Sequence, residues 1–210
     1  MSHAADIDLA GINAELGRNA SALVAWALGL GKQAIVTTNF RPFEAVILHM
    51  VTRVQPDVPV VWMDNGYNTP ATYRYADEVA RLLKLNLKTY LPLRSRAHRE
   101  AVDGPTPAIG APGHDAFTQE VKLEPFARAL RETGPEVWFT ALRATDSAVR
   151  AQMEPVSINP DGLIKVAPLL HWSSKELHEY CVAHGLPNNF DYVDPTKGEE
   201  QRECGLHLAH

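Results

Sequence analysis

One cysteine stands in a segment that could expose a reactive thiol. Cys204 lies in a polar stretch close to the C-terminus, two residues after Arg202 and three before His207. A thiol becomes a useful nucleophile when a nearby cation lowers its pKa and a substrate can reach it, and Arg202 and His207 could supply that cation. The residues alone leave two interpretations open: a catalytic nucleophile, or an incidental exposed cysteine near a chain end.

The second cysteine, Cys181, belongs to an amphipathic segment with Leu177 and Val182, where we expect a buried structural side chain. Two cysteines cannot supply four thiolates, which excludes a Cys₄ zinc site or an iron–sulfur cluster within one chain. The histidines form no HxxxH or HExxH pair, so we predict no metal site. Any thiol chemistry therefore uses one nucleophile, and a resolving thiol would come from another molecule.

Polar residues follow three of the expected strands, where an open parallel sheet binds its ligands. They are Thr37, Thr38 and Asn39 after the first strand, Asp64 and Gly66 after the second, and Arg143 after a later one. Hydroxyls and backbone N–H groups can hold a phosphate, an aspartate can accept from a ribose or base, and an arginine can clamp a phosphate or sulfate. The alternative is that polar residues simply occupy strand ends.

Arg143 and Arg150 are seven positions apart, which is two turns of a helix. This spacing would let both guanidinium groups face one side and clamp an oxyanion. It is equally typical of the solvated face of an ordinary helix, and the spacing does not decide between the two.

Strand and helix patterns alternate along the chain. β-branched runs predict strands at 34–38, 58–64, 87–91, 136–142 and 163–170. Helical spacing predicts helices at 43–54, 70–85 and 121–131, and another from Ser173 or Ser174 to His184 that Gly185 ends. The Gly/Pro-rich stretch 103–113 is expected to be a surface loop. The alternation predicts an α/β fold with a doubly wound, mostly parallel sheet flanked by helices.

The composition of the 210 residues is that of a globular protein. With 45% hydrophobic and 21% charged residues the chain is not largely disordered, and its net charge of −5 argues against a dedicated nucleic-acid binder. We expect one α/β domain over 1–187, with a helical N-terminal segment, and a mobile polar tail over 188–210. The sequence has neither a membrane-spanning apolar run nor a basic n-region, so a cytoplasmic location is expected.

Five segments match, in order, the motifs of a known family. They are 64–74 (DNGYNTPATYR), 122–125 (KLEP), 138–150 (WFTALRATDSAVR), 165–172 (KVAPLLHW) and 203–207 (ECGLH). Together they resemble the phosphoadenylyl-sulfate (PAPS) reductase family of the PP-loop, adenine-nucleotide α-hydrolase-like superfamily. The resemblance extends from about Gln33 to His207.

The resemblance implies a cysteine-based reduction of a sulfonucleotide to sulfite. The Cys204 thiolate, tuned by Arg202 and His207, would take the sulfonate group as S-sulfocysteine and release adenosine 3′,5′-bisphosphate. Thioredoxin or glutaredoxin would then release sulfite, and the enzyme is expected to be a homodimer. A mobile tail is consistent with this mechanism, because the Cys204 sulfur reacts first with the nucleotide and then with the partner protein. The implied substrate-binding residues are Thr37, Thr38, Asn39, Phe40, Asp64, Gly66, Lys122, Arg143 and Arg150.

The sequence departs from the family pattern at the loop after the first strand. The family pattern is approximately S-S-S-F-G-x-Q-A/D-A-V, and residues 37–46 read TTNFRPFEAV. Arg41 stands at the glycine, Pro42 lacks an N–H donor, and Glu44 adds a negative charge. In the arginine segment, Asp146 replaces a glutamine. Each change is expected to weaken the binding of anions, and of a 3′-phosphate above all.

The cysteine count also bears on the substrate. Relatives that reduce adenylyl sulfate (APS) commonly hold a [4Fe–4S] cluster through paired cysteines, and the matching region, 117–125, has none. The resemblance therefore favours a cluster-free, thioredoxin-dependent PAPS reductase of sulfate assimilation. The alternatives are a non-catalytic nucleotide-binding relative and a cluster-free APS reductase. An ATP-using PP-loop ligase is disfavoured because the S-G-G-x-D-S motif is absent.

Overall fold

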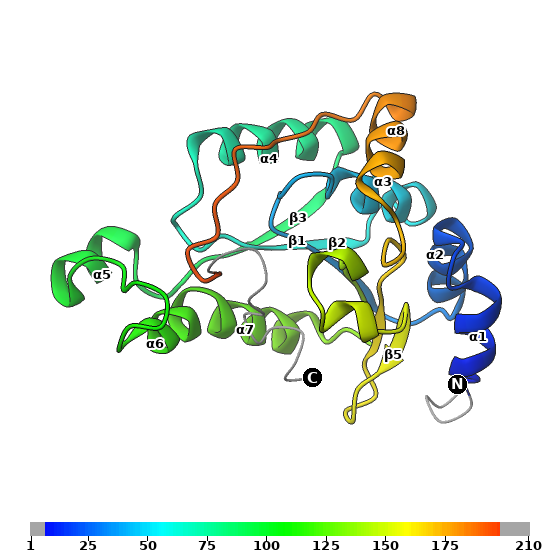
Figure 1. Ribbon diagram of the computed structural model, residues 1–210, viewed down its shortest axis with the longest axis horizontal. Coiled ribbons are helices and arrows are strands. Elements are labelled where there is room, and N and C mark those ends of the chain that lie inside the picture. Colours follow the sequence, from blue (N-terminus) through cyan, green and yellow to red (C-terminus); the bar gives the residue numbers. More distant parts are fainter. Residues whose placement is uncertain (1–6, 198–210) are drawn as a thin grey trace.

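The computed structural model describes residues 7–197 and places a six-stranded sheet at its centre, in the order β3-β2-β1-β4-β6-β5 (Figure 1). The strands are β1 (Ala34–Thr38), β2 (Pro59–Met63), β3 (Asn86–Tyr90), β4 (Val137–Phe139), β5 (Val156–Ile158) and β6 (Ile164–Val166). The helices are α1 (Leu9–Leu16), α2 (Ala20–Gly29), α3 (Ala45–Val54), α4 (Pro70–Leu83), α5 (Arg96–Asp103), α6 (His114–Thr118), α7 (Glu124–Thr133) and α8 (Ser174–His184). The expected α/β fold with a mostly parallel sheet is confirmed.

The strand order reverses at β1, and this reversal creates the crevice in which such folds bind ligands. From β1 the chain moves to β2 and β3 on one side and later returns to β4 on the other side. β1 is parallel to both neighbours, with Val36 opposite Val60 and also opposite Phe139. The loops that leave β1 and β4 therefore diverge from the same edge of the sheet.

Alternating side chains of the strands pack into two apolar layers. Val36, Val60 and Phe139 face the larger core, which α2, α3, α4 and α8 cover. Ile35 and Trp138, which are neighbours in the register, face a smaller core under α7. Because both faces are covered, β1 and β4 are fully buried, and this explains the continuous runs of apolar and β-branched residues in these two strands.

Capping residues close to each helix end set the bounds of α8 and α4, which the sequence predicted closely. Ser173 caps α8 in a reciprocal capping box with Glu176, and Gly185 ends it in the left-handed conformation. Thr69 caps α4, and Pro70 occupies its first turn.

The structure differs from the expectation in several elements, and α5 lies where no helix was predicted. The single helix expected at 121–131 is three joined pieces: α6, a π-helix over Gln119–Leu123, and α7. The antiparallel edge strand β5 was not predicted, because three residues are too short to show a period.

Residues 188–197 run from the end of α8 along α4 and across to the π-helix on the other side of the sheet (Figure 1). Asn189 donates to Thr72 Oγ1, and the Asp191 carbonyl accepts from the Thr69 and Thr72 hydroxyls. His114 Nε2 lies 3.3 Å from the Pro195 carbonyl oxygen. This part of the segment differs from the expected weakly packed tail, because polar side chains hold it in place of aliphatic ones.

Cys181 is buried in the larger core, as expected, and burial raises the pKa of its thiol. Within residues 7–197, no helix is both long and apolar enough to cross a membrane.

Candidate active site

The loop after β1 closes on the carboxylate of Glu44. Glu44 Oε2 accepts from the Thr38 hydroxyl at 2.8 Å and from the Asn39 backbone N–H at 2.7 Å. Glu44 Oε1 accepts from Arg41 Nε at 2.8 Å. Two of the donors expected to hold a phosphate therefore point at an acidic side chain of the protein itself.

Thr37 and Phe40, also expected in the substrate site, have structural contacts. The Thr37 hydroxyl accepts from Trp138 Nε1 at 2.9 Å and is buried between β1 and β4. Phe40 is fully buried, and its ring packs edge-on against Trp62 and Tyr75. The ring of Phe40 therefore belongs to the core and does not face a ligand.

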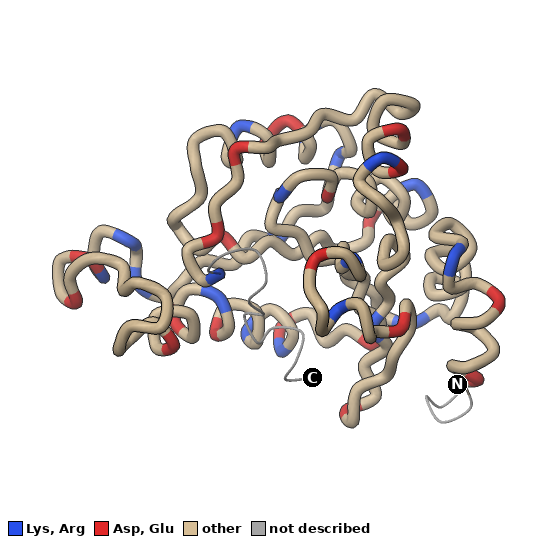
Figure 2. Tube along the Cα trace, viewed as in Figure 1, with Lys and Arg blue, Asp and Glu red and all other residues tan. Residues whose placement is uncertain are grey.

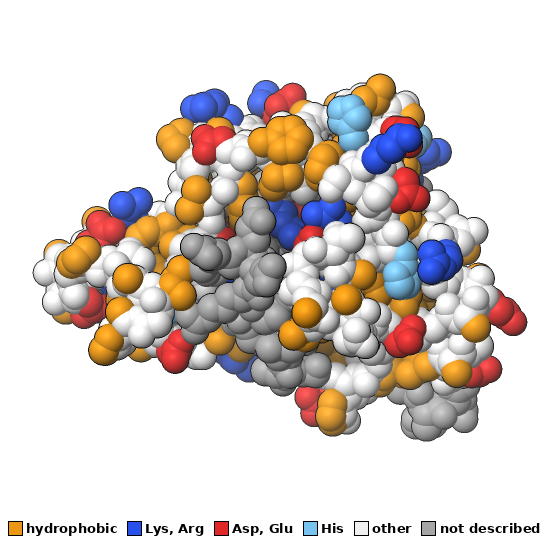
Figure 3. Space-filling view, viewed as in Figure 1, with side chains coloured by type: hydrophobic (Ala, Val, Ile, Leu, Met, Phe, Trp, Pro, Cys, Tyr) orange, Lys and Arg blue, Asp and Glu red, His pale blue; other side chains and the backbone are white. Residues whose placement is uncertain are grey.

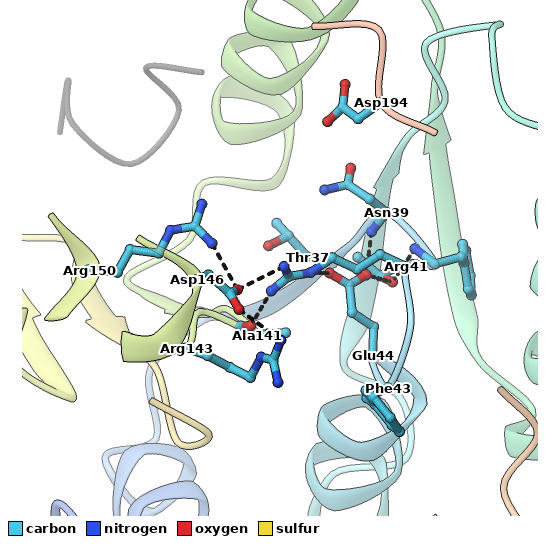
Figure 4. A network of polar contacts seen from close by, with 12 residues as sticks. Thr37, Asn39, Arg41, Phe43, Glu44, Ala141, Arg143, Asp146, Arg150 and Asp194 are labelled. Atoms are coloured by element: carbon cyan, nitrogen blue, oxygen red, sulfur yellow. Dashed lines mark hydrogen bonds and ion pairs between the residues drawn. The ribbon is translucent and has the colours of Figure 1, made fainter. Parts of the chain in front are cut away.

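Asp146 joins three arginines from two loops (Figure 4). Its carboxylate lies 2.9 Å from Arg41 Nη1, 2.8 Å from Arg143 Nη2 and 3.1 Å from Arg150 Nη1. The segment after β4 forms two 3₁₀ turns, Ala144–Asp146 and Arg150–Gln152, in place of an α-helix. The solvated-helix interpretation of this arginine pair is wrong, because the Arg150 side chain is only 3% exposed.

Arg41 ties the loop after β1 to the loop after β4. In addition to its ion pairs with Glu44 and Asp146, it donates from Nη2 to the Ala141 carbonyl at 2.6 Å. Both acidic and basic positions lie along these two loops (Figure 2). Basic side chains also gather in a hollow near the middle of this face of the molecule (Figure 3).

Opposite charges set the protonation states within this cluster. Burial raises the pKa of the Asp146 carboxyl, but Arg41, Arg143 and Arg150 lower it more, so the net shift is downward. Burial lowers the pKa of Arg41, and the charges of Glu44 and Asp146 more than reverse that effect. Asp146 is therefore ionised and Arg41 is charged at neutral pH.

The expected nucleoside-binding pair, Asp64 and Gly66, forms a tight turn after β2. Asp64 Oδ1 accepts from the Gly66 N–H at 3.0 Å, Asn68 Nδ2 at 2.9 Å and the Tyr73 hydroxyl at 2.9 Å. Gly66 has a φ of +79°, which favours glycine. Burial and the Asp64 contact raise the pKa of Tyr73 to about 12, so its hydroxyl stays a donor. Within residues 7–197, Asp64 Oδ2 has no hydrogen-bond partner and could accept from a ligand.

Lys122, expected to bind substrate, is buried on the π-helix and pairs with Asp194. Its ammonium group also donates to the Thr196 hydroxyl at 3.1 Å. Burial raises the pKa of Asp194, and Lys122 lowers it more, which gives a net decrease. The Lys122 ammonium group is therefore bound by residues 194–196, which precede Cys204 in the chain.

Cys204, Arg202 and His207 lie outside the described residues. Among residues 7–197, no group of three or more His, Cys, Asp or Glu side chains could hold a metal ion. A groove of about 790 Å³ between α1 and strands β5 and β6 is lined mainly by apolar side chains and contains none of the arginines that meet at Asp146.

Sequence reasoning missed three residues of this region. It treated Glu44 and Asp146 only as departures from a pattern, and it assigned no role to Asp194. The sign of their charges was the available signal, since a lone acidic residue between arginines favours an ion pair.

Comparisons with known proteins identify the family of this chain. Residues 33–191 match the family model described as the phosphoadenosine phosphosulfate reductase domain. This chain belongs to that family. A phosphoadenosine 5′-phosphosulfate reductase from Xanthomonas axonopodis is 38% identical, covering 95% of this chain and 92% of its own length. A reductase of the same name from Shigella flexneri is 36% identical, covering 95% of this chain and 91% of its own length.

Solved structures share the fold of this family member. A PAPS reductase from Candida auris superimposes with a TM-score of 0.75 at 23% identity, covering 86% of this chain and 87% of the other. A U34-tRNA thiolase from Methanococcus maripaludis gives a TM-score of 0.60 at 9% identity, covering 89% of this chain and 68% of the other. The likeness confirms the expected α/β fold.

Proposed function

We propose that this chain is a cluster-free PAPS reductase, which turns 3′-phosphoadenylyl sulfate and a dithiol into sulfite, adenosine 3′,5′-bisphosphate and a disulfide. The supporting observation is that Arg41, Arg143 and Arg150 meet at one point beyond β1 and β4. Open α/β sheets bind ligands at this edge, and arginine donors suit phosphate and sulfate oxygens.

In the first step, the Cys204 thiolate attacks the sulfur of the sulfate group. A bond forms between Sγ and that sulfur, and the bond from sulfur to the bridging oxygen breaks. The electron pair leaves on the 5′-phosphate of adenosine 3′,5′-bisphosphate. Nearby guanidinium groups stabilise the charge that grows on this oxygen, while Asp64 holds the nucleoside through a ribose or base donor.

In the second step, a thiolate of thioredoxin or glutaredoxin attacks Sγ of the S-sulfocysteine. Sulfite leaves with the electron pair of the broken S–S bond, and a mixed disulfide forms. The second thiol of the partner resolves it, so that the partner is oxidised by two electrons and Cys204 returns as a thiol. This cycle needs one cysteine on the enzyme, and the reducing cytoplasm keeps such a thiol free.

Mass spectrometry of the intact protein tests the proposal. After incubation with PAPS, the chain should gain the mass of one sulfonate group, and C204S should abolish the gain. C181S is the matched control and should keep the adduct, because Cys181 is buried in the core. No adduct with either PAPS or APS would refute the proposed chemistry.

The Glu44 carboxylate supports a second candidate, a nucleotide-binding relative without reductase activity. It already accepts the Thr38 hydroxyl and the Asn39 N–H, donors that a substrate phosphate would otherwise use. Calorimetric binding of adenosine 3′,5′-bisphosphate without sulfite release in the presence of thioredoxin would favour this candidate. Competition between PAPS and APS for sulfite formation would identify the preferred sulfonucleotide.

A further inference from the structure

Three departures from the family pattern, far apart in the sequence, meet in one ion-pair network. Arg41 stands at a glycine position, Glu44 at the A/D position and Asp146 at a glutamine position. In the structure Arg41 lies between the two carboxylates, at 2.8 Å from Glu44 and 2.9 Å from Asp146 (Figure 4). The three residues therefore form one structural unit.

The network fixes the Arg41 side chain in a single orientation. Nε points to Glu44, Nη1 to Asp146 and Nη2 to the carbonyl of Ala141. These contacts use three of the five N–H donors of a guanidinium group. One N–H on Nη1 and one on Nη2 have no acceptor within residues 7–197, and the side chain is 22% exposed.

The charges of the cluster leave it suited to an anion. Arg41, Arg143 and Arg150 carry three positive charges, and Glu44 and Asp146 carry two negative ones. These five residues therefore carry one more positive than negative charge, and Arg41 lies in a partly desolvated position, where hydrogen bonds to an anion are strong.

We propose that Arg41 is a substrate-binding, specificity-determining residue that gives its two remaining N–H donors to a phosphate or sulfate oxygen of the sulfonucleotide. Glu44 and Asp146 are positioning residues that hold the guanidinium for this contact. The inference rests on the proposed function for the identity of the ligand. It replaces the expectation that Glu44 simply weakens anion binding.

Calorimetry with adenosine 3′,5′-bisphosphate provides the direct test. R41Q should raise the dissociation constant roughly ten- to hundredfold, as expected for lost hydrogen bonds to a charged group. R41K keeps the charge but cannot bridge two carboxylates and a carbonyl, so its effect should be intermediate. The matched control is R94Q, because Arg94 also bridges two carboxylates, Glu120 and Asp103, and lies outside the cluster.

A double variant guards against misfolding and against a simple change of net charge. R41Q removes the cation that pairs with the carboxylates of Glu44 and Asp146. R41Q/E44Q removes one positive and one negative charge, so the net charge of the protein stays the same. The double variant should therefore melt near the wild-type temperature and still bind the bisphosphate about tenfold more weakly or worse. The inference would be overturned if R41Q and R41K both bound the bisphosphate within twofold of R94Q and also kept the wild-type KM for PAPS and APS.

Substrate kinetics identify which anionic group Arg41 contacts. A higher KM for PAPS alone in R41Q would assign the 3′-phosphate, and a loss with both PAPS and APS would assign the phosphosulfate. Wild-type protein that binds the bisphosphate but makes no sulfite would refute the reductase proposal and leave the Arg41 inference intact. Normal turnover by R41Q with an unchanged KM for both nucleotides would refute only the inference.

Discussion

Lys122 and Asp194 form a buried ion pair across 72 positions of the chain, with side chains only 4% and 5% exposed. This pair fastens the segment after α8 to the π-helix between α6 and α7. Six residues separate Lys197, the last described position, from Cys204, so the chain takes seven Cα-to-Cα steps between them. A fully extended chain of that length reaches about 25 Å, so the anchor restricts where the proposed nucleophile can act.

Removal of one partner of this pair should be costly. D194N leaves the buried ammonium group of Lys122 without its carboxylate, and the free energy of unfolding should fall by about 3–5 kcal/mol. Urea denaturation measures the change. The double variant K122M/D194L should be more stable than D194N, because no uncompensated charge stays buried. If K122M/D194L lost as much free energy of unfolding as D194N, or more, the ion pair itself would be shown to stabilise the fold.

Acid should weaken the fold through Asp146 and Asp194. The pKa of each carboxyl lies below its ordinary value of 3.8 in the folded state, because arginines or Lys122 outweigh the effect of burial. Their contribution to stability is therefore complete above the unfolded pKa and is lost as the pH falls through the lower folded pKa. Unfolding measured between pH 6 and pH 2 should show this loss below about pH 4. D194N should flatten that part of the curve, and an unchanged slope would contradict the assignment.

Phe40 should matter for stability more than for substrate contact. Its ring is fully buried against Trp62 and Tyr75, so F40A should cost about 3–5 kcal/mol of unfolding free energy. F190A is the matched control, because Phe190 is 73% exposed, and its cost should stay near 0.5 kcal/mol. The milder variant F40L provides the opposing outcome. If F40L kept the wild-type free energy of unfolding and its KM for PAPS rose tenfold, the ring of Phe40 would belong to the substrate site.

Tyr73 should affect the nucleoside end of the site through Asp64. Y73F removes the 2.9 Å hydrogen bond from the Tyr73 hydroxyl to Asp64 Oδ1. The KM for PAPS should rise about two- to tenfold, as expected for the loss of one hydrogen bond from a neutral donor. Y90F is the control, because the Tyr90 hydroxyl bonds to Glu132 on α7 and not to Asp64. Equal KM values in Y73F and wild type would indicate that Asp64 needs no support from Tyr73.

The amino-acid sequence by itself determined five of the six strands, most of the helices and the family. β-branched runs marked β1 and β2, and Ser173 and Gly185 marked the ends of α8, because burial and capping act over neighbouring residues. The ordered motifs indicated the family that residues 33–191 match. The roles of Cys204, Arg202 and His207 stay predictions from the sequence.

Only the tertiary structure decided which charges meet. Arg41 and Asp146 are 105 positions apart, and Lys122 and Asp194 are 72 apart, so no local pattern could pair them. The strand order, which reverses at β1, brings the loops after β1 and β4 to one edge of the sheet. Ion pairs depend on distances of a few ångströms in space, and only the completed packing of the sheet and helices sets those distances.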